Sequence, residues 1–189
     1  MALVDKWRAT VPMCPARSAV RPAPAPSMLS YCLFGRRIRG ADGGAVRMFL
    51  GRHSHTLDTK GRLAVPARFR EELTGGVVLT RGIDRCLALY PMAAWQPLAE
   101  KVSALPISDP DARTFRRMVF AEAIDLELDG QGRILVPPDL RRYAEIEREA
   151  YVVGVNSSIE IWSPPRWESV TATMDNDGAA IAQRLASLI

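Results

Sequence analysis

The chain has 189 residues, and its 25 lysines and arginines exceed its 21 aspartates and glutamates, for a net charge of +4. That length accommodates one or two small domains. No apolar run approaches the roughly 20 residues of a membrane-spanning helix, and three cysteines without metal-ligand spacing exclude a disulfide framework. We therefore expect a globular protein of the cytoplasm with no membrane segment.

The positive charge is confined to the first quarter of the chain. Residues 1–47 hold eight basic and two acidic residues, a net charge of +6, whereas residues 48–189 hold 17 basic and 19 acidic residues, a net charge of −2. Five prolines between Pro12 and Pro26 disfavour regular structure there. Residues 1–47 are either a disordered basic tail that touches nucleic acid or upstream sequence ahead of a native start at Met48. We favour the second, because Met48 opens the first strongly patterned segment.

An internal repeat organises the chain from Met48 onward. Leu57–Pro66 (LDTKGRLAVP) matches Leu128–Pro137 (LDGQGRILVP) at an offset of 71, and Leu87–Trp95 matches Ile159–Trp167 at an offset of 72. We call the two copies the first and the second repeat. Two unrelated blocks that agree in offset within one residue indicate a duplication rather than chance.

Each repeat is predicted to hold four short strands and one short helix. The strands of the first repeat cover residues 54–57, 62–65, 77–80 and 86–90, with a helix over 66–73. Those of the second cover 124–128, 133–136, 150–153 and 158–162, with a helix over 137–144. Helices over 91–104 and 109–123 link the repeats, and two more, at 163–174 and 179–188, are separated by Asp177-Gly178.

A repeat of about 45 residues is too small to fold alone, so the two repeats must share a core and pack as a pseudo-dimer. The predicted fold class is mainly β with helices, α+β. The predicted domain plan follows the repeat. It has a first domain over 52–95, linking helices over 96–123, a second domain over 124–167 and a C-terminal helical segment over 168–189.

An Asp-x-x-x-Arg motif occurs at a turn in each repeat, as Asp58/Arg62 and Asp129/Arg133. In the structural interpretation, the aspartate accepts hydrogen bonds from nearby backbone N–H groups, the arginine pairs with it, and the intervening glycine adopts a positive φ. The residues that would stabilise the turns are then Asp58, Asp129, Gly61 and Gly132.

In the functional interpretation, the same turns present Lys60, Arg62, Gln131 and Arg133 to an anionic surface. An arginine can hydrogen-bond guanine or grip a phosphate, and a pair of β-loops can enter a DNA major groove. The residues alone leave the structural and functional interpretations open.

Other patterns carry less weight. His53 and His55 have no third ligand in view and are expected to be ordinary surface or core histidines rather than a metal site. Arg113, Arg116 and Arg117 form a basic stripe that is solvated, pairs with acids of a neighbouring protomer or contacts phosphate. No catalytic or phosphate-binding motif is present, so we expect no enzyme activity, no cofactor and no small-molecule substrate.

Four segments taken together resemble the MraZ family: Met48–Gly51, His55–Arg70, Leu87–Trp95 and Asp129–Pro137. The resemblance covers the chain from Met48 onward. It implies a bacterial transcriptional regulator associated with the nucleoid, which binds direct repeats in double-stranded DNA upstream of the division and cell-wall gene cluster, usually including its own gene. It also implies two SpoVT-AbrB-like half-barrels in one chain and assembly into ring-like homo-oligomers.

The resemblance carries over to single residues. Arg62 and Arg133 stand at the family's motif arginines, Asp58 and Asp129 at its aspartates, and Lys60 at its usual basic position, whereas Gln131 is neutral at the equivalent place. The first loop is therefore expected to contribute more to DNA binding than the second. The alternative is an antitoxin-type module that holds a partner protein, against which stand the fusion of two repeats and the lack of a disordered toxin-binding tail.

Overall fold

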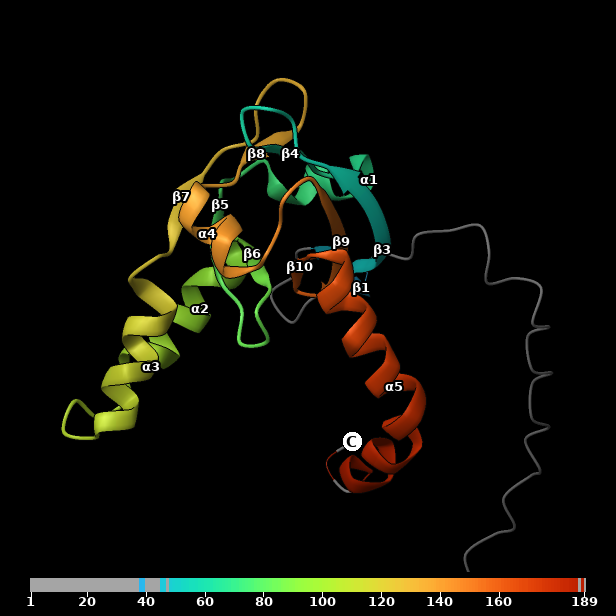
Figure 1. Ribbon diagram of the computed structural model, residues 1–189. Helices are drawn as coiled ribbons and strands as arrows, with labels where there is room; N and C mark the ends of the chain where they lie inside the picture. Colours follow the sequence, from blue (N-terminus) through green and yellow to red (C-terminus); the bar gives the residue numbers. More distant parts are fainter. Residues whose placement is uncertain (1–37, 40–44, 47, 187, 189) are drawn as a thin grey trace, which may run out of the picture. The chain divides into compact units, whose positions relative to one another are not determined.

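The computed structural model describes residues 38–39, 45–46, 48–186 and 188 (Figure 1). The two interpretations of residues 1–47 therefore fall almost wholly outside the described residues. Within that segment, β1 (Ile38–Arg39) and β2 (Ala45–Val46) pair as a short antiparallel ladder, which the sequence analysis does not predict.

The remaining strands and helices follow in chain order. The elements of the first repeat and its linking helices are β3 (Phe49–Thr56), β4 (Arg62–Ala64), α1 (Ala67–Arg70), the 3-10 helix η2 (Glu71–Leu73), β5 (Val77–Arg81), β6 (Leu87–Pro91), α2 (Met92–Ser103) and α3 (Pro110–Phe120). Those of the second repeat are β7 (Ile124–Leu126), β8 (Arg133–Leu135), α4 (Pro138–Tyr143), β9 (Glu149–Asn156), β10 (Ser158–Trp162) and α5 (Pro164–Leu185).

The two repeats interleave in one sheet of six antiparallel strands, in the order β3-β9-β10-β6-β5-β7. The first strand of each repeat pairs with a strand of the other repeat, β3 with β9 and β7 with β5. The equivalent strands β6 and β10 meet at the centre. The arrangement is a pseudo-twofold one about that central pair, and it confirms the predicted α+β class.

One apolar cluster joins the repeats. Its buried members come from both, among them Val77, Leu79, Leu87, Leu89, Ile134, Val152, Ile159 and Ile161. Because a buried aliphatic side chain contributes about 1.5–3 kcal/mol relative to an exposed one, removing either repeat would strip the other of half its core. The expectation that neither repeat folds alone follows directly from this shared packing.

Two segments differ most from the sequence prediction. The first strand starts at Phe49 and not at Ser54, because β9 offers a pairing partner over the full length of β3. The predicted break at Asp177-Gly178 is wrong, because α5 continues through it to Leu185. A glycine costs a helix interior about 1 kcal/mol relative to alanine, but it keeps its N–H, so the backbone hydrogen bonds continue.

The long helices α2, α3 and α5 lie away from the short β4–β8 ladder. The α2–α3 hairpin follows the first repeat, α5 follows the second, and both extend from the end of the sheet opposite that ladder (Figure 1). The Asp109 side chain caps α3 by accepting a hydrogen bond from the backbone N–H of Asp111. No helix among the described residues is long and apolar enough to span a bilayer.

Candidate functional site

Strands β4 and β8 bring the two motif loops together. They pair antiparallel, with Arg62 opposite Leu135 and Ala64 opposite Arg133. The backbone N–H of Val65 donates to the Gly132 carbonyl, and that of Val136 donates to the Gly61 carbonyl, both at 2.9 Å. Residues 57–62 and 128–133, which we call the paired loops, therefore stand side by side at one end of the fold (Figure 1).

Each loop is closed by its own aspartate in the same way. In the first loop, the Asp58 carboxylate accepts hydrogen bonds from the backbone N–H groups of Lys60 and Arg62, both at 2.9 Å. In the second, Asp129 accepts from Gln131 and Arg133 at 2.9 and 3.0 Å. These are Asx-type turns, in which a side chain fixes the backbone two to four residues further along.

The aspartates and arginines form one cluster across the paired loops. Arg62 Nε lies 2.7 Å from Asp58 Oδ2, while Arg133 reaches Asp129 Oδ2 through Nε at 2.8 Å and Nη2 at 2.7 Å. Across the loops, Arg133 Nη1 lies 3.7 Å from Asp58 Oδ2 and Arg62 Nη1 lies 4.0 Å from Asp129 Oδ2. Each arginine thus faces both carboxylates, and the charges of the four groups cancel.

These contacts stabilise the ionised carboxylates. The backbone hydrogen bond from Arg62, reinforced by that residue's guanidinium, lowers the pKa of Asp58. The hydrogen bond from the Arg133 guanidinium is the largest of the effects that lower the pKa of Asp129 to about 2. At neutral pH the cluster is fully charged, so the arginine orientations are fixed before any ligand arrives.

The two loops differ in what they leave accessible. The Arg62 side chain is 32% exposed and uses only Nε at short range, whereas Arg133 is 22% exposed and uses two nitrogens on Asp129. The side chains of Lys60 and Gln131 are exposed, and Lys60 pairs with no acidic group among the described residues. The first loop therefore presents more accessible positive charge than the second.

Two further arginines support the paired loops, and the sequence analysis missed them. An ideal Cβ on Gly61 would lie 3.0–3.3 Å from the guanidinium of Arg141, and one on Gly132 would overlap the side chain of Arg70. Arg70 also donates from Nε to the Val65 carbonyl at 2.9 Å. Arg70 and Arg141 are separated by 71 residues, the offset of the motif itself, and that signal could have found them.

The glycines of the motif follow from this arrangement. Gly61 has φ +78° and Gly132 has φ +74°, a region that L-residues rarely adopt, and each has an arginine of the other repeat packed against it. The arginine of each repeat therefore braces the loop of the other repeat.

The local charge contrasts with that of the whole body. Residues 57–62 and 128–133 hold three cations (Lys60, Arg62 and Arg133) and two acids (Asp58 and Asp129), a net charge of +1, and the side chains of Arg70 and Arg141 pack against their glycines. Residues 48–189 together carry −2. The paired loops are thus a positive projection on a slightly acidic body.

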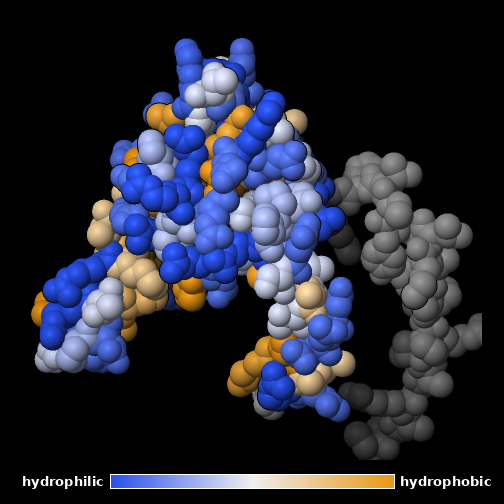
Figure 2. All heavy atoms as spheres, in the orientation of Figure 1, coloured by the Kyte–Doolittle hydropathy of each residue, from blue (hydrophilic) through white to orange (hydrophobic). Residues whose placement is uncertain are grey.

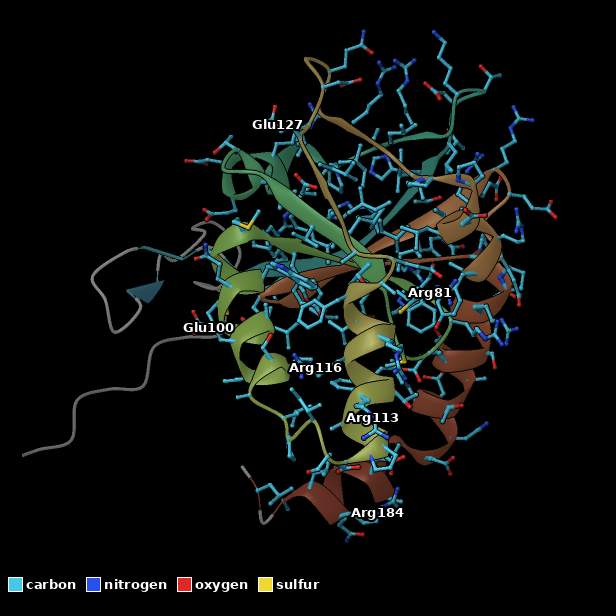
Figure 3. The ribbon with its side chains drawn as sticks, turned by 90° about the vertical axis from the view of Figure 1, so that its left-hand side faces the viewer. Arg81, Glu100, Arg113, Arg116, Glu127 and Arg184 are labelled. Atoms are coloured by element: carbon cyan, nitrogen blue, oxygen red, sulfur yellow. The ribbon has the colours of Figure 1, made fainter. Side chains whose placement is uncertain are left out.

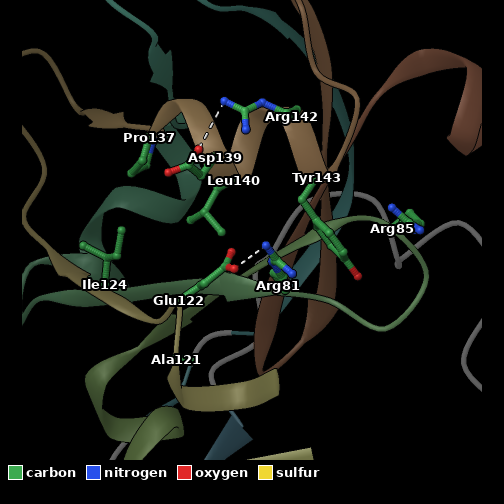
Figure 4. Close-up of a pocket in the computed structure, with 10 residues that line it drawn as sticks. All are labelled: Arg81, Arg85, Ala121, Glu122, Ile124, Pro137, Asp139, Leu140, Arg142 and Tyr143. Carbon is green, nitrogen blue, oxygen red and sulfur yellow. Dashed lines mark ion pairs between the residues drawn. The ribbon is translucent and has the colours of Figure 1, made fainter. Parts of the chain in front are cut away.

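A separate cavity of about 680 Å³ lies between α4 and β5 (Figure 4). Its charged groups are largely paired within the chain: Arg81 with Glu122, and Arg142 with Asp139 at 3.3 Å. Arg81 and Arg85 lie 4.5 and 5.4 Å from the centre of the Tyr143 ring. A concave site with compensated charge is unsuited to a duplex, so the paired loops remain the candidate site.

The histidines lie on one face of β3, as the alternation of a strand requires. Their ring centres are 6.5 Å apart, and the His53 ring stands edge-on to Phe69 at 5.4 Å. Burial, followed by the charges of His53 and Arg70, lowers the pKa of His55. No group of three or more metal-ligating side chains is found in the part of the chain that the structure describes.

Comparison with known proteins gives concordant matches. Residues 48–118 and 119–188 each match the family described as "MraZ protein, putative antitoxin-like". The "Transcriptional regulator MraZ" of Thermomicrobium roseum is 68% identical over 142 residues, which is 75% of this chain and 100% of that protein. The proteins of the same name from Roseiflexus castenholzii and Moorella thermoacetica are 52% and 47% identical, covering 75% and 73% of this chain and 99% and 96% of theirs.

Proposed function

Because the chain belongs to the MraZ family, we propose that it is a DNA-binding transcriptional regulator whose paired loops, residues 57–62 and 128–133, contact the duplex. One observation carries this proposal: β4 and β8 join two Asp-x-x-x-Arg loops from distant parts of the chain into a single positive projection. A two-stranded projection of this kind is narrow enough to enter the major groove. The relatives are named as regulators, which agrees with the expectation that the chain is not an enzyme.

The Asp–Arg cluster prepares the arginines for recognition. Asp58 holds Arg62 at Nε, and Nη1 lies 4.0 Å from Asp129, so neither Nη group makes a short ion pair and both can reach guanine O6 and N7 or a phosphate. The side chain loses little conformational freedom on binding, because its rotamer is already fixed. The role of each aspartate in this proposal is to position its arginine.

The first loop contributes more than the second. Lys60 adds an exposed ammonium group where the second loop has the neutral Gln131, and Arg62 is less engaged by its aspartate than Arg133. We assign Arg62 the main contact, Lys60 a phosphate contact, and Arg133 and Gln131 weaker contacts. Asp58, Asp129, Gly61 and Gly132 keep the loops in shape.

Affinity comes from repetition rather than from total charge. A body of net charge −2 is a poor non-specific DNA ligand, and one molecule offers few contacts. A ring-like homo-oligomer on direct repeats in a promoter would engage several paired loops at once and multiply the affinity of each. By its family, the chain would act in the cytoplasm at the nucleoid, on the division and cell-wall gene cluster that includes its own gene.

The test is binding to the DNA upstream of its own gene across a salt series. Arg62→Ala is expected to weaken binding at least about tenfold, since a good bidentate base contact is worth about 1–3 kcal/mol. Arg184→Ala, which removes an exposed arginine from α5 at the opposite end, is the charge-matched control and should bind like the unmodified protein. Unchanged affinity in Arg62→Ala, or equal binding to shuffled DNA, would contradict the proposal.

A second candidate function is an antitoxin-type protein partner, which the wording of the family description favours. The two are distinguished by purification from native cells. A stoichiometric protein partner together with no preference for promoter DNA would favour the partner-binding function. Promoter preference by the purified chain alone favours the regulator.

A further inference from the structure

The cavity between α4 and β5 has a counterpart in the first repeat, and the two places differ in chemistry. Four of the residues that line the cavity are Glu122, Ile124, Asp139 and Leu140. At the 71-residue offset they correspond to residues of β3 and α1, namely Gly51, His53, Arg68 and Phe69. Where the second repeat has two carboxylates, the first therefore has an arginine and a glycine without a side chain.

Phe69 holds the two nitrogen-bearing side chains of this place in position. Its ring is buried and packs edge-on to Phe49 at 5.3 Å. The His53 ring stands edge-on to Phe69 at 5.4 Å, and the Arg68 guanidinium lies 5.6 Å from the centre of the same ring. One buried ring therefore orients both the imidazole and the guanidinium.

The imidazole and the guanidinium converge over Gly51. An ideal Cβ on that glycine would lie 3.8 Å from Arg68 Nη1 and 3.9 Å from His53 Nε2. Gly51 also has φ +93°, a backbone conformation that L-residues rarely adopt. A glycine at this position therefore keeps a side chain out of the space that the two nitrogens face.

Neither nitrogen has a partner in the part of the chain that the structure describes. His53 Nε2 is buried there and makes no hydrogen bond, which is unfavourable for a polar atom. Arg68 is exposed and forms no ion pair with a described acid, whereas its counterpart Asp139 pairs with Arg142 at 3.3 Å. Because Arg68 is exposed, its side chain can turn outward and admit a ligand that accepts hydrogen bonds from both groups.

We propose that Arg68 and His53 form an oxyanion-binding site on the first repeat, and that the group it takes is a phosphate. A guanidinium and an imidazole N–H are both donors, and the several oxygens of a phosphate accept from both at once. The site lies outside the paired loops and shares no residue with them. Its phosphate belongs either to the DNA backbone or to free phosphate.

Both sources suit the position of the site. Strand β3 ends at Thr56, directly before the first of the paired loops, so DNA held at the loops lies next to β3. Helix α1 carries Arg70, whose side chain packs against Gly132, so a free phosphate on Arg68 would hold the helix that braces the second loop. Figure 2 shows a mainly hydrophilic surface around the paired loops and on the neighbouring upper right of the molecule, where β3 and α1 lie.

The first experiment uses inorganic phosphate and the full chain without DNA. The chain holds only two histidines, His53 and His55, so its imidazole NMR signals are few, and His53→Ile, which installs the residue of the second repeat, assigns them. Phosphate added at constant ionic strength is expected to shift the His53 signal until it saturates. Arg68→Gln should weaken the phosphate affinity at least about tenfold, because it removes charge-assisted hydrogen bonds.

A matched control separates the site from a general effect of lost charge. Arg184 is exposed near the end of α5, far from β3 and α1 (Figure 3), and Arg184→Gln should bind phosphate like the unmodified chain. Melting temperatures check that all variants stay folded. Arg68 is exposed and its counterpart in the second repeat is an aspartate, so the fold does not require an arginine at this place.

The second experiment identifies the source of the phosphate from promoter binding across a salt series. If the site holds a backbone phosphate, Arg68→Gln should make the slope of log affinity against log salt shallower by about 0.9, and Arg184→Gln should leave it unchanged. An unchanged slope together with the His53 shift assigns the site to free phosphate. The proposal is overturned if Arg68→Gln alters neither the His53 response to phosphate nor the slope. Because the first experiment contains no DNA, it tests the site even if the paired loops bind no promoter.

Discussion

The two repeats are nearly identical at the paired loops and dissimilar around them. The three hydrogen bonds to the aspartate measure 2.9, 2.9 and 2.7 Å in the first loop and 2.9, 3.0 and 2.8 Å in the second. Yet the exposed residue at the loop is Lys60 in one and Gln131 in the other. The backbone of the loop is thus set by the motif, while the residue that meets a ligand is free to differ.

The edges of the sheet differ more. Strand β3 pairs with β9 over eight residues, whereas its counterpart β7 pairs only with Val77–Leu79 of β5. Near β3, Phe69 packs edge-on to Phe49 at 5.3 Å. The equivalent residue near β7 is Leu140, which lines the cavity beside α4. The β3 edge of the sheet is thus covered by a long strand pairing and aromatic packing, whereas the β7 edge borders a cavity.

The largest effect on stability is expected at the β3 edge, where β3 pairs with β9. Gly154 lies opposite Gly51, and a Cβ added there would overlap the backbone of Phe49 and Leu50. Since backbone in a ladder cannot move aside cheaply, Gly154→Ala should lower the free energy of unfolding by about 3 kcal/mol, the upper end for overpacking. Urea denaturation at neutral pH measures it.

Gly82 is the residue of the first repeat that corresponds to Gly154 at the 72-residue offset, and it supplies the comparison. A Cβ on Gly82 would meet the Cys86 sulfur, a side-chain atom, with the Cys86 carbonyl oxygen at 3.2 Å. Because that side chain can shift, Gly82→Ala should lose clearly less stability than Gly154→Ala. Equal losses in the two variants would show that the two edges are packed alike after all.

The paired loops allow a graded test of the same kind. Gly132→Ala combines a positive φ, which costs an L-residue about 1–2 kcal/mol, with overlap on Arg70. Gly61→Ala carries the same backbone cost with a looser contact to Arg141. Gly130 has open space around it and no positive φ, so Gly130→Ala should change stability by less than about 0.5 kcal/mol. Thermal melts should show the largest loss of stability at Gly132, a smaller one at Gly61 and the smallest at Gly130. Any other order would contradict the packing of Arg70 and Arg141 against the opposite loops.

The sequence predicts those features of the fold and of the candidate site that depend on residues close together in the chain. The turns, the short helices that begin at proline and the shared core follow from residues close in sequence and from the 71-residue offset. The interleaving of strands does not, because no local pattern says that β3 pairs with β9 of the other repeat rather than within its own. The packing of Arg70 and Arg141 on opposite loops is hidden for the same reason.

At the C-terminal helix the prediction fails for the opposite reason, because a local pattern indicates a break that the structure does not have. Asp177-Gly178 has the composition of a turn, but the flanking apolar periodicity from Trp167 to Leu185 is continuous, and that longer pattern prevails in the structure. A repeat comparison with α2 does not predict this continuation, since α2 ends at Ser103, which corresponds to Asp175 at the 72-residue offset.

The Asp–Arg cluster predicts that the stability of the second loop depends on pH. The pKa of Asp129 lies at about 2, below its ordinary 3.8, so the stability it contributes is present above about pH 4 and is lost as the pH falls toward 2. Asp129→Asn should therefore be less stable than the unmodified chain at pH 7, and the difference should vanish near pH 2. Denaturant titrations at both pH values measure it. A difference that persists at pH 2 would mean that the charge of Asp129 is not what holds the loop.

The smallest effect concerns the one exposed position at which the loops differ in charge. Replacing Lys60 by Gln makes the first loop resemble the second, and replacing Gln131 by Lys makes the second resemble the first. Each phosphate contact changes the slope of log affinity against log salt by about 0.9. Lys60→Gln should therefore flatten the slope, Gln131→Lys should steepen it by a similar amount, and the double swap should restore it, because the loop backbones are interchangeable. If the double swap instead binds like Lys60→Gln alone, the second loop does not reach the DNA, and recognition belongs to the first loop together with its Arg62.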